Sequence, residues 1–342
     1  MKTCEFNYTL PKELIAQHPR GNRDQARMLV LDRAEKTITH QTISRITNHL
    51  TPTDALVLNN TKVMHSRILG QKESGGRIEV LFLEEIEENI WKALIKTSRR
   101  PQLGTPFFLG KDRLEVTILK EGEKGEALVS IISSSLIKLF DKEGLPPLPP
   151  YIDRKNMTTE MLEQDKVRYQ TIYASQLGAA AAPTAGLHFT PEILRNIKNK
   201  GTAISELTLH VGLGTFRPVS SDHIKDHIMH EESYHISQET ADSLNQSKKS
   251  NGRIVAVGST SVRTLESLSE LKETSGRTDL FIYPPYSFKF VDAILTNFHL
   301  PQSSLLMMMA AFTGYDFLME AYQEAIKQKY KFFSYGDCML IL

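Results

Sequence analysis

The sequence is poor in cysteine and carries no excess of charge of either sign. Only two of its 342 residues are cysteines, Cys4 and Cys338, and they lie at opposite ends of the chain. This spacing fits neither a disulfide scaffold nor a zinc site, and such low cysteine usage is typical of a reducing compartment. Lys and Arg together number 41, and Asp and Glu number 40. The overall charge therefore neither predicts nor excludes a polyanionic partner such as RNA.

Long hydrophobic runs are also missing from the sequence. No window reaches the length of apolar residues that crosses a bilayer, and the first residues lack the apolar core of a signal peptide. We therefore expect a cytoplasmic protein that does not associate with membranes. The apolar fraction of 40% and the charged fraction of 24% are ordinary for a folded globular chain and argue against disorder. The length allows two domains with cores of their own.

Short β-type segments occupy the chain from about Ser66 to Ser133, separated by glycine-rich turns. Several of them alternate apolar and polar residues, which is the pattern of half-buried strands. Six such strands predict a small barrel or sandwich. The proline-rich segment Gly144–Pro150 favours an extended connector, so we place a domain boundary there.

The two flanking parts of the chain mix buried-strand runs with helical periodicity, which indicates an α/β domain. The runs Ala55–Leu58 and Ile254–Val257 lead directly into the polar segments Asn59–Lys62 and Gly258–Arg263. In open α/β sheets, ligands bind where strand ends meet such loops. We predict one α/β domain built from both ends of the chain, with a small all-β barrel inserted into it. The predicted parts are 1–65 (α/β, first part), 66–150 (barrel) and 151–342 (α/β, second part).

Four polar segments, each punctuated by glycine or proline, interrupt the regular patterns of the α/β parts. Small residues around a histidine let the backbone approach a ligand, whereas core segments use large apolar side chains to fill volume. Four such segments predict a single large pocket. They are Gly178–Thr190, Leu209–Pro218, Gly258–Arg263 and Thr296–Ser304.

Histidines occur in three of these segments, as His188, His210 and His299, and His230 lies beside an acidic pair. A single histidine in such a context is more often structural than functional, but four together favour an acid/base site. Their spacing gives no metal-ligand motif. The sequence also contains no Gly-x-Ser-x-Gly elbow and no Cys/His signature of acyl transfer.

Two glycine-containing segments have competing interpretations. The segment Gly212–Arg217 is half of a dinucleotide-binding motif, but it lacks the third glycine and the following acidic residue, so a nicotinamide cofactor is disfavoured. Gly258–Arg263 is suited to hold an anion or a ribose at a helix start, and capping of that helix by Ser259 or Thr260 explains it equally well. Near the C-terminus, the aromatic residues of Tyr330–Tyr335 are interleaved with lysine and are candidates for stacking on unpaired bases.

Longer motifs run through the chain from end to end. They are Tyr8–Gln17 with Arg23–Arg27, Ala182–Thr190, His210–Pro218, Thr296–Pro301 and Phe332–Asp337. In content and order they resemble the S-adenosylmethionine:tRNA ribosyltransferase-isomerases of queuosine biosynthesis. That family's plan, an α/β domain with an inserted β-barrel, agrees with the layout predicted above.

The resemblance implies a specific reaction. The ribosyl part of S-adenosylmethionine would move onto the aminomethyl group of 7-aminomethyl-7-deazaguanine at the tRNA wobble position and isomerise to an epoxycyclopentane. The products would be epoxyqueuosine-tRNA, adenine and methionine. S-adenosylmethionine would be a co-substrate, and we expect no prosthetic group, no metal and no obligate protein partner. An S-adenosylmethionine-dependent tRNA methyltransferase and a non-catalytic tRNA-binding protein remain as alternatives.

The chemistry of these motifs suggests roles for individual residues, whereas the resemblance locates the pocket and does not fix each role. General acid/base work is assigned to His188 and His299, with Glu232 or Asp337 as orienting carboxylates. The residues expected to contact the nucleoside donor are Gly186, Gly212, Gly214, Thr215, Ser261 and Arg263. Those expected to contact tRNA phosphate or a substrate carboxylate are Arg23, Arg27, Lys62 and Arg217.

The sequence departs from the family pattern at several positions. Asn60 stands where the family usually has aspartate, which keeps hydrogen bonding but removes a charge, so we assign that position no proton transfer. Met64–Ser66, Ser259 and Pro285 also differ from the usual residues and affect loop detail.

Overall fold

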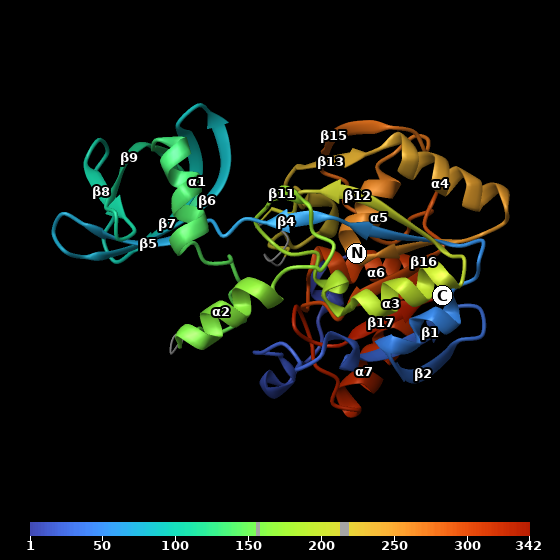
Figure 1. Cartoon of the computed structure of the whole chain (residues 1–342). Helices are drawn as coiled ribbons and strands as arrows, with labels where there is room; N and C mark the ends of the chain where they lie inside the picture. Colours follow the sequence, from blue (N-terminus) through green and yellow to red (C-terminus); the bar gives the residue numbers. More distant parts are fainter. Residues whose placement is uncertain (155–157, 213–218) are drawn as a thin grey trace. The chain divides into compact units, whose positions relative to one another are not determined.

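The computed structural model describes residues 1–154, 158–212 and 219–342, and the chain divides into two compact units (Figure 1). The α/β unit consists of Met1–Lys62, Pro149–Lys155 and Gln170–Leu342, and the barrel unit of Val63–Leu148 and Asn156–Tyr169. The insertion that we proposed at residues 66–150 falls close to the first part of the barrel unit. The helix α2 (Thr159–Arg168), on the C-terminal side of that proposed boundary, belongs to the barrel unit.

A nine-stranded mixed sheet forms the centre of the α/β unit, in the order β15-β13-β12-β3-β14-β16-β17-β1-β2. The strands β12, β3, β14 and β16 are mutually parallel, so their carboxyl ends lie along one edge of the sheet. A separate two-stranded sheet pairs β4 with β11. The bounds are β1 Arg27–Asp32, β2 Thr37–Thr42, β3 Ala55–Asn59, β4 Thr61–Val63, β11 Gln176–Ala179, β12 Ala203–Leu209, β13 Glu232–Ile236, β14 Ile254–Val257, β15 Thr274–Thr278, β16 Ala293–Asn297 and β17 Cys338–Ile341.

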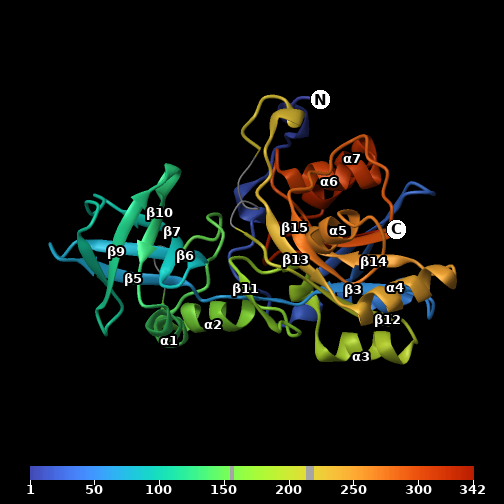
Figure 2. The same cartoon turned by 90° about the horizontal axis from the view of Figure 1, so that it is seen from above.

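Helices cover both faces of this sheet, which is why its central strands are continuous apolar runs. In β3, Val57 packs into one core while Leu56 and Leu58 pack into the other. The first core also holds α4, α5, α6 and α7, and the second holds α3 with η4 and η6; Figure 2 shows α3 on the opposite side of the sheet from α6 and α7. The bounds are α3 Pro191–Asn199, α4 Gln238–Lys249, α5 Gly258–Glu266, α6 Ser304–Thr313, α7 Tyr315–Lys327, η1 Thr3–Phe6, η2 Lys12–Leu14, η3 Arg23–Gln25, η4 Ile43–His49, η6 Thr184–His188 and η8 Ile224–Asp226.

The barrel unit contains a closed barrel with the strand order β10-β7-β6-β5-β8-β9. Alternate residues of its strands point inward, as in β7, where every second side chain from Trp91 to Ile95 is buried. The rings of Phe82, Trp91 and Phe140 meet in this core with centroids 5.6–6.0 Å apart. The predicted fold class, an α/β domain with a small all-β barrel, is therefore confirmed. The bounds are β5 Arg67–Lys72, β6 Arg77–Glu87, β7 Ile90–Thr97, β8 Pro106–Leu109, β9 Leu114–Glu121, β10 Glu126–Ser130, η5 Glu123–Gly125 and α1 Ser133–Glu143.

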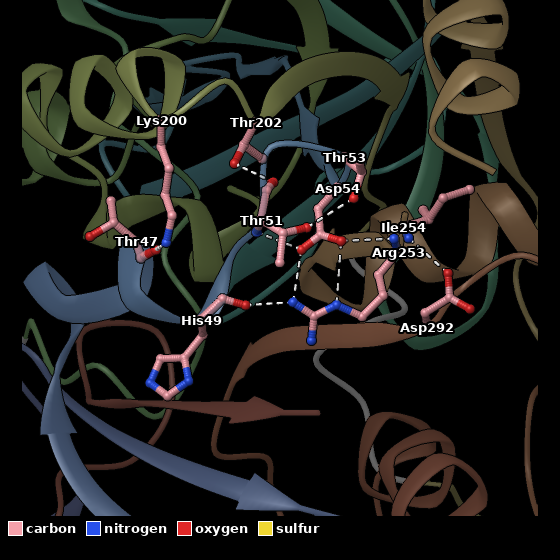
Figure 3. Close-up of polar contacts among 10 residues, drawn as sticks. All are labelled: Thr47, His49, Thr51, Thr53, Asp54, Lys200, Thr202, Arg253, Ile254 and Asp292. Atoms are coloured by element: carbon pink, nitrogen blue, oxygen red, sulfur yellow. Dashed lines mark hydrogen bonds and ion pairs between the residues drawn. The ribbon is translucent and has the colours of Figure 1, made fainter. Parts of the chain in front are cut away.

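A polar network ties together the amino-terminal ends of the parallel strands (Figure 3). Asp54, directly before β3, accepts hydrogen bonds from the backbone and the guanidinium of Arg253, directly before β14, at 2.8 and 2.7 Å. Thr51 N also donates to Asp54, at 2.8 Å. Burial alone would raise the pKa of Asp54, but the bonds from Arg253 and Thr51 outweigh it and hold this pKa below its ordinary value. These bonds fix one edge of the sheet, and the opposite edge carries the polar loops.

Candidate functional site

A pocket lies at the carboxyl edge of the parallel strands, within the α/β unit. About 660 Å³ of empty space lies within it, a volume that includes open solvent. Its walls come mainly from the segments that follow β11, β12, β14 and β16, together with Tyr151 and Phe333–Ser334. The lining includes Ala181–Ala185, Gly258–Thr260 and Thr296–Leu300. All four polar segments singled out in the sequence therefore contribute lining residues to one pocket, the segment Leu209–Pro218 through Val211.

Helix α5 begins at this pocket. The chain leaves β14 and enters the helix at Gly258, whose φ of +83° is a conformation that glycine adopts readily and other residues rarely do. No side chain caps the start of α5, and its first turn contains no acidic residue. Its first backbone amides therefore give the pocket a positively polarised wall.

His299 lines the pocket, and both polar groups of its backbone are hydrogen-bonded. Its N–H donates to the Tyr322 hydroxyl at 2.9 Å, and its carbonyl accepts a hydrogen bond from the Tyr8 hydroxyl. The imidazole Nε2 lies 2.9 Å from Thr296 Oγ1. Burial lowers the pKa of His299 to about 3, so the ring is uncharged at neutral pH. The geometry presents a fixed, neutral imidazole to a ligand.

His188 lies one hydrogen bond behind the pocket wall. It is 4% exposed and does not itself line the pocket, and its Nε2 is 3.2 Å from Oδ1 of Asn297, which does. The Asn297 amide nitrogen donates to the carbonyl of Phe333 at 2.7 Å. Because the oxygen of Asn297 must then face His188, Nε2 carries the ring proton. Burial lowers the pKa of His188 to about 4, with Asn297 and Asp337 opposing this effect only in part.

Glu232 and Arg263 form a buried ion pair outside the pocket lining. The Arg263 guanidinium donates to Glu232 Oε2, and its other nitrogens donate to the carbonyls of Leu280 and Thr278 at 3.2 and 3.3 Å. The remaining carboxylate oxygen of Glu232 accepts a hydrogen bond from Gly212 N at 2.8 Å. The pair therefore holds the glycine that follows β12 and connects it to α5.

Asp337 is a second fully buried carboxylate, and its contacts are with backbone and arginine. Arg20 Nη2 lies 2.7 Å from its Oδ1. The backbone N–H groups of Arg27 and Lys331 donate to its two oxygens, each at 2.8 Å. This arrangement ties the start of β1 to the loop before β17 and provides a negative charge that acts on His188 through space.

Within the described part of the chain, the pocket lining contains no Lys, Arg, Asp or Glu side chain. Its polar groups are hydroxyls, the Asn297 amide, His299 and the backbone at the start of α5. Among the described residues, no group of three or more His, Cys, Asp or Glu side chains is placed to hold a metal ion. No helix in the same ranges is both long and apolar enough to cross a bilayer.

Comparison with known proteins identifies the family. The family model described as "Queuosine biosynthesis protein" matches residues 3–341. The chain belongs to this family. Proteins from Thermotoga petrophila and Thermosipho africanus, both named S-adenosylmethionine:tRNA ribosyltransferase-isomerase, are each 48% identical to it over 100% of both chains. The crystal structure of S-adenosylmethionine tRNA ribosyltransferase from Thermotoga maritima is 40% identical, with a TM-score of 0.57 over 99% of this chain and 100% of that one. The predicted family and the predicted transferase-isomerase class are thus confirmed.

In this member of the queuosine biosynthesis family, the residues predicted to bind the donor have surroundings that differ from one residue to the next. Gly186 is buried where a Cβ would meet the Tyr173 hydroxyl at 2.0 Å, so a close internal contact requires glycine there. Ser261 is fully buried, and its hydroxyl donates to the Val257 carbonyl at 2.8 Å. Neither residue lines the pocket. Gly214 and Thr215 lie outside the described residues.

The arginines predicted to contact RNA are engaged within the protein. Arg23 donates to the carbonyls of Leu187 and Gln170 at 2.8 and 2.9 Å, so it supports the backbone next to His188. Arg27 donates to the Gln328 carbonyl at 2.7 Å and stacks over the Tyr330 ring at 3.7 Å. Lys62 is exposed, and Arg217 lies outside the described residues. Tyr330 is itself fully buried, so its ring offers no surface on which a base could stack. Phe333 is nearly buried, and it lines the pocket.

Sequence analysis did not assign a binding role to two individual residues that line the pocket. Asn297 follows the apolar run of β16, and an amide at the end of a buried strand is the signal that could have found it. Thr260 was named individually only as a helix cap, within a segment that we considered suited to an anion or a ribose; no side chain caps α5, and Thr260 lines the pocket. Both lie in segments that we had singled out.

Proposed function

We propose that this protein transfers the ribosyl part of S-adenosylmethionine to 7-aminomethyl-7-deazaguanine at the wobble position of tRNA and isomerises it, forming epoxyqueuosine-tRNA. Adenine and methionine leave. S-adenosylmethionine is a co-substrate in this proposal, and the partner is the modified tRNA. The names of relatives that are 48% identical over the whole chain support the reaction class. A cytoplasmic location stays a prediction.

The observation that carries the proposal is the pocket at the carboxyl edge of the parallel strands. It combines the neutral, buried imidazole of His299, the uncapped start of α5 and three aromatic side chains, Tyr151, Phe298 and Phe333. A sulfonium acidifies the neighbouring ribose carbon, so a neutral base beside it can remove that proton and start the loss of adenine. The described lining contains no Lys, Arg, Asp or Glu side chain, so the positive charge of the donor's own sulfonium would activate that carbon.

Within this proposal, His299 is the group placed to exchange a proton with a bound ligand, because it lines the pocket. His188 would act as a positioning residue, since its hydrogen bond fixes the amide of Asn297. Glu232 would position the segment that begins at Gly212, and Asp337 would position the chain near His188. Arg263 would help to position the segment that begins at Gly212, because it holds the Glu232 carboxylate.

The proposal is tested by incubating the purified protein with S-adenosylmethionine and tRNA that carries 7-aminomethyl-7-deazaguanine. Mass spectrometry of the small molecules and the digested tRNA should find adenine, methionine and a matching mass gain on that nucleoside. Release of S-adenosylhomocysteine would instead identify a methyltransferase. Binding of tRNA with no donor consumed would leave a non-catalytic RNA-binding protein.

The division of roles between the two histidines is tested with single variants. His299→Ala should lower kcat by at least about 100-fold, the range of a lost general base. His188→Ala should lower kcat less, because Asn297 keeps its bond to the Phe333 carbonyl. Both should leave tRNA affinity near that of the unmodified protein. A His299→Ala variant with unchanged kcat would remove this residue from the chemistry.

A further inference from the structure

The start of α5 is a helix end whose partial positive charge no side chain of its first turn neutralises. The helix has nine residues, begins without a side-chain cap and has no acidic residue in its first turn. Gly258, Ser259 and Thr260, its first three residues, all line the pocket. An uncapped helix start favours a negatively charged group, which accepts hydrogen bonds from the free amides.

Thr260 adds an unused hydrogen-bonding group at the same place. The residue is 7% exposed, and its Oγ1 is buried without a hydrogen-bond partner among the described residues. This oxygen lies 3.7 Å from the position that a Cβ on Gly258 would occupy, and the Cβ of Ala185, another lining residue, lies 3.6 Å from the same position. The following hydroxyls of the helix are occupied, because Ser261 donates to Val257 O and Thr264 donates to Thr260 O. A buried hydroxyl without a partner points to a missing acceptor.

The other lining residues indicate where a negatively charged acceptor could bind in this pocket. The lining side chains of the described residues include no arginine or lysine that could receive an anion. The imidazole of His299 is uncharged at neutral pH, because burial lowers its pKa to about 3. The helix start is therefore the part of the described lining that is best suited to a negative group.

We propose that the start of α5, with the Thr260 hydroxyl and the backbone amides of Gly258–Thr260, is a carboxylate-binding subsite. It would receive the carboxylate of the methionyl part of S-adenosylmethionine. This assignment rests on the proposed function, since it names the part of the donor that the subsite holds. The carboxylate is the one anionic group of that donor, and fixing it would orient the sulfonium and the ribose relative to His299.

The proposal is tested by isothermal titration calorimetry with two donors that differ by one group. S-adenosylmethionine carries the carboxylate, and decarboxylated S-adenosylmethionine lacks it. The unmodified protein should bind the first at least about tenfold more tightly. Thr260→Val removes the hydroxyl at nearly constant volume and should weaken S-adenosylmethionine binding about tenfold, with little change for the decarboxylated donor. Thr260→Ser, which restores a hydroxyl, should recover most of the preference.

Thr313→Val is the matched control. Thr313 is also a buried helical threonine whose Oγ1 has no hydrogen-bond partner among the described residues, but it lies at the end of α6 and does not line the pocket. This variant should bind both donors as the unmodified protein does. It separates the loss of a carboxylate contact from a general effect of replacing a buried threonine.

Other outcomes would overturn the proposal in distinguishable ways. Equal weakening of both donors by Thr260→Val would place the hydroxyl against the nucleoside, and no weakening of either would leave it without a role in donor binding. A loss of tRNA affinity with donor binding intact would make the anion an RNA phosphate. If the unmodified protein bound neither donor, the proposed function itself would fail. If it bound both equally, only the carboxylate subsite would fail.

Discussion

Lowering the pH from 7 to 5 should destabilise the α/β unit strongly, because two histidines are buried there without charge. Burial lowers the pKa of His188 to about 4 and that of His299 to about 3, from an ordinary value of 6.5. In the unfolded chain each ring takes up a proton near pH 6.5, whereas in the folded chain it does so only well below pH 5. Protons therefore bind preferentially to the unfolded state. The stability that depends on these rings is present above pH 6.5 and is lost as the pH falls toward the folded-state pKa values.

The magnitude follows from the two pKa values of each group. For a ring that titrates at 6.5 when unfolded and at about 4 when folded, the free energy of unfolding falls by roughly 2 kcal/mol between pH 7 and pH 5. His299 contributes a similar amount, so the two together account for roughly 4 kcal/mol. This is a large part of the usual net stability of a domain.

The assay is urea unfolding followed by far-UV circular dichroism at pH 7 and at pH 5. His188→Gln and His299→Gln should each remove roughly 2 kcal/mol from the difference between the two pH values, whatever they do to stability at pH 7. His230→Gln, which removes an exposed imidazole, is the control and should retain the wild-type difference. The fluorescence of Trp91, the single tryptophan, reports on the barrel unit, which contains neither buried histidine. Retention of the full pH difference in both glutamine variants would refute the description of a neutral, buried histidine pair.

The sequence predicted most of the architecture because its strongest signals are local. The runs that became β3 and β14 are apolar on both faces, which is expected of strands covered by helices on each side. The alternation in the segment that became β7 predicted a strand with one buried face. The polar loops after β3 and β14 also follow directly from the chain, because parallel strands place their carboxyl ends along one edge.

The pairing of charges in the α/β unit could not be predicted in the same way. Glu232 pairs with Arg263, from a different element, and Asp337 pairs with Arg20 from the opposite end of the chain. Each carboxylate was a reasonable partner for a histidine when judged by its type and its neighbours in the sequence. Which cation or backbone amide reaches it depends on how distant segments pack, and local pattern contains no information on that.

The orientation of individual side chains on α5 could not be predicted from the sequence for a related reason. Ser261 and Thr260 are neighbours of similar chemistry, but successive helical residues point in directions about 100° apart. Only Thr260 faces the pocket, and the Ser261 hydroxyl bonds to the backbone of the preceding turn. Choosing between them requires the residue at which the helix starts and its rotation on the sheet.

Two further predictions concern polar contacts at the two ends of the parallel strands. Asp54→Asn should lower the free energy of unfolding by about 1–3 kcal/mol at pH 7, because it removes the charge that Arg253 contacts. The bonds hold the pKa of Asp54 below its ordinary value. The difference in stability between the wild type and Asp54→Asn should therefore shrink below about pH 4, as the wild-type carboxylate is protonated. Urea unfolding at pH 7 and pH 3.5 measures this difference, and an equal value at both pH values would contradict the prediction. At the other end, the Asn60 amide donates to Glu206 at 3.1 Å while its oxygen accepts from Thr208 at 2.7 Å. Asn60→Asp would keep the second bond but set two carboxylates against each other, which should cost about 0.5–1 kcal/mol at this exposed contact. Glu206→Gln alone should be close to neutral, and in the double variant its amide can donate to the new carboxylate and restore the loss. Because only the contact with Glu206 differs between these backgrounds, failure of the double variant to recover stability would show that this hydrogen bond does not explain the asparagine at position 60.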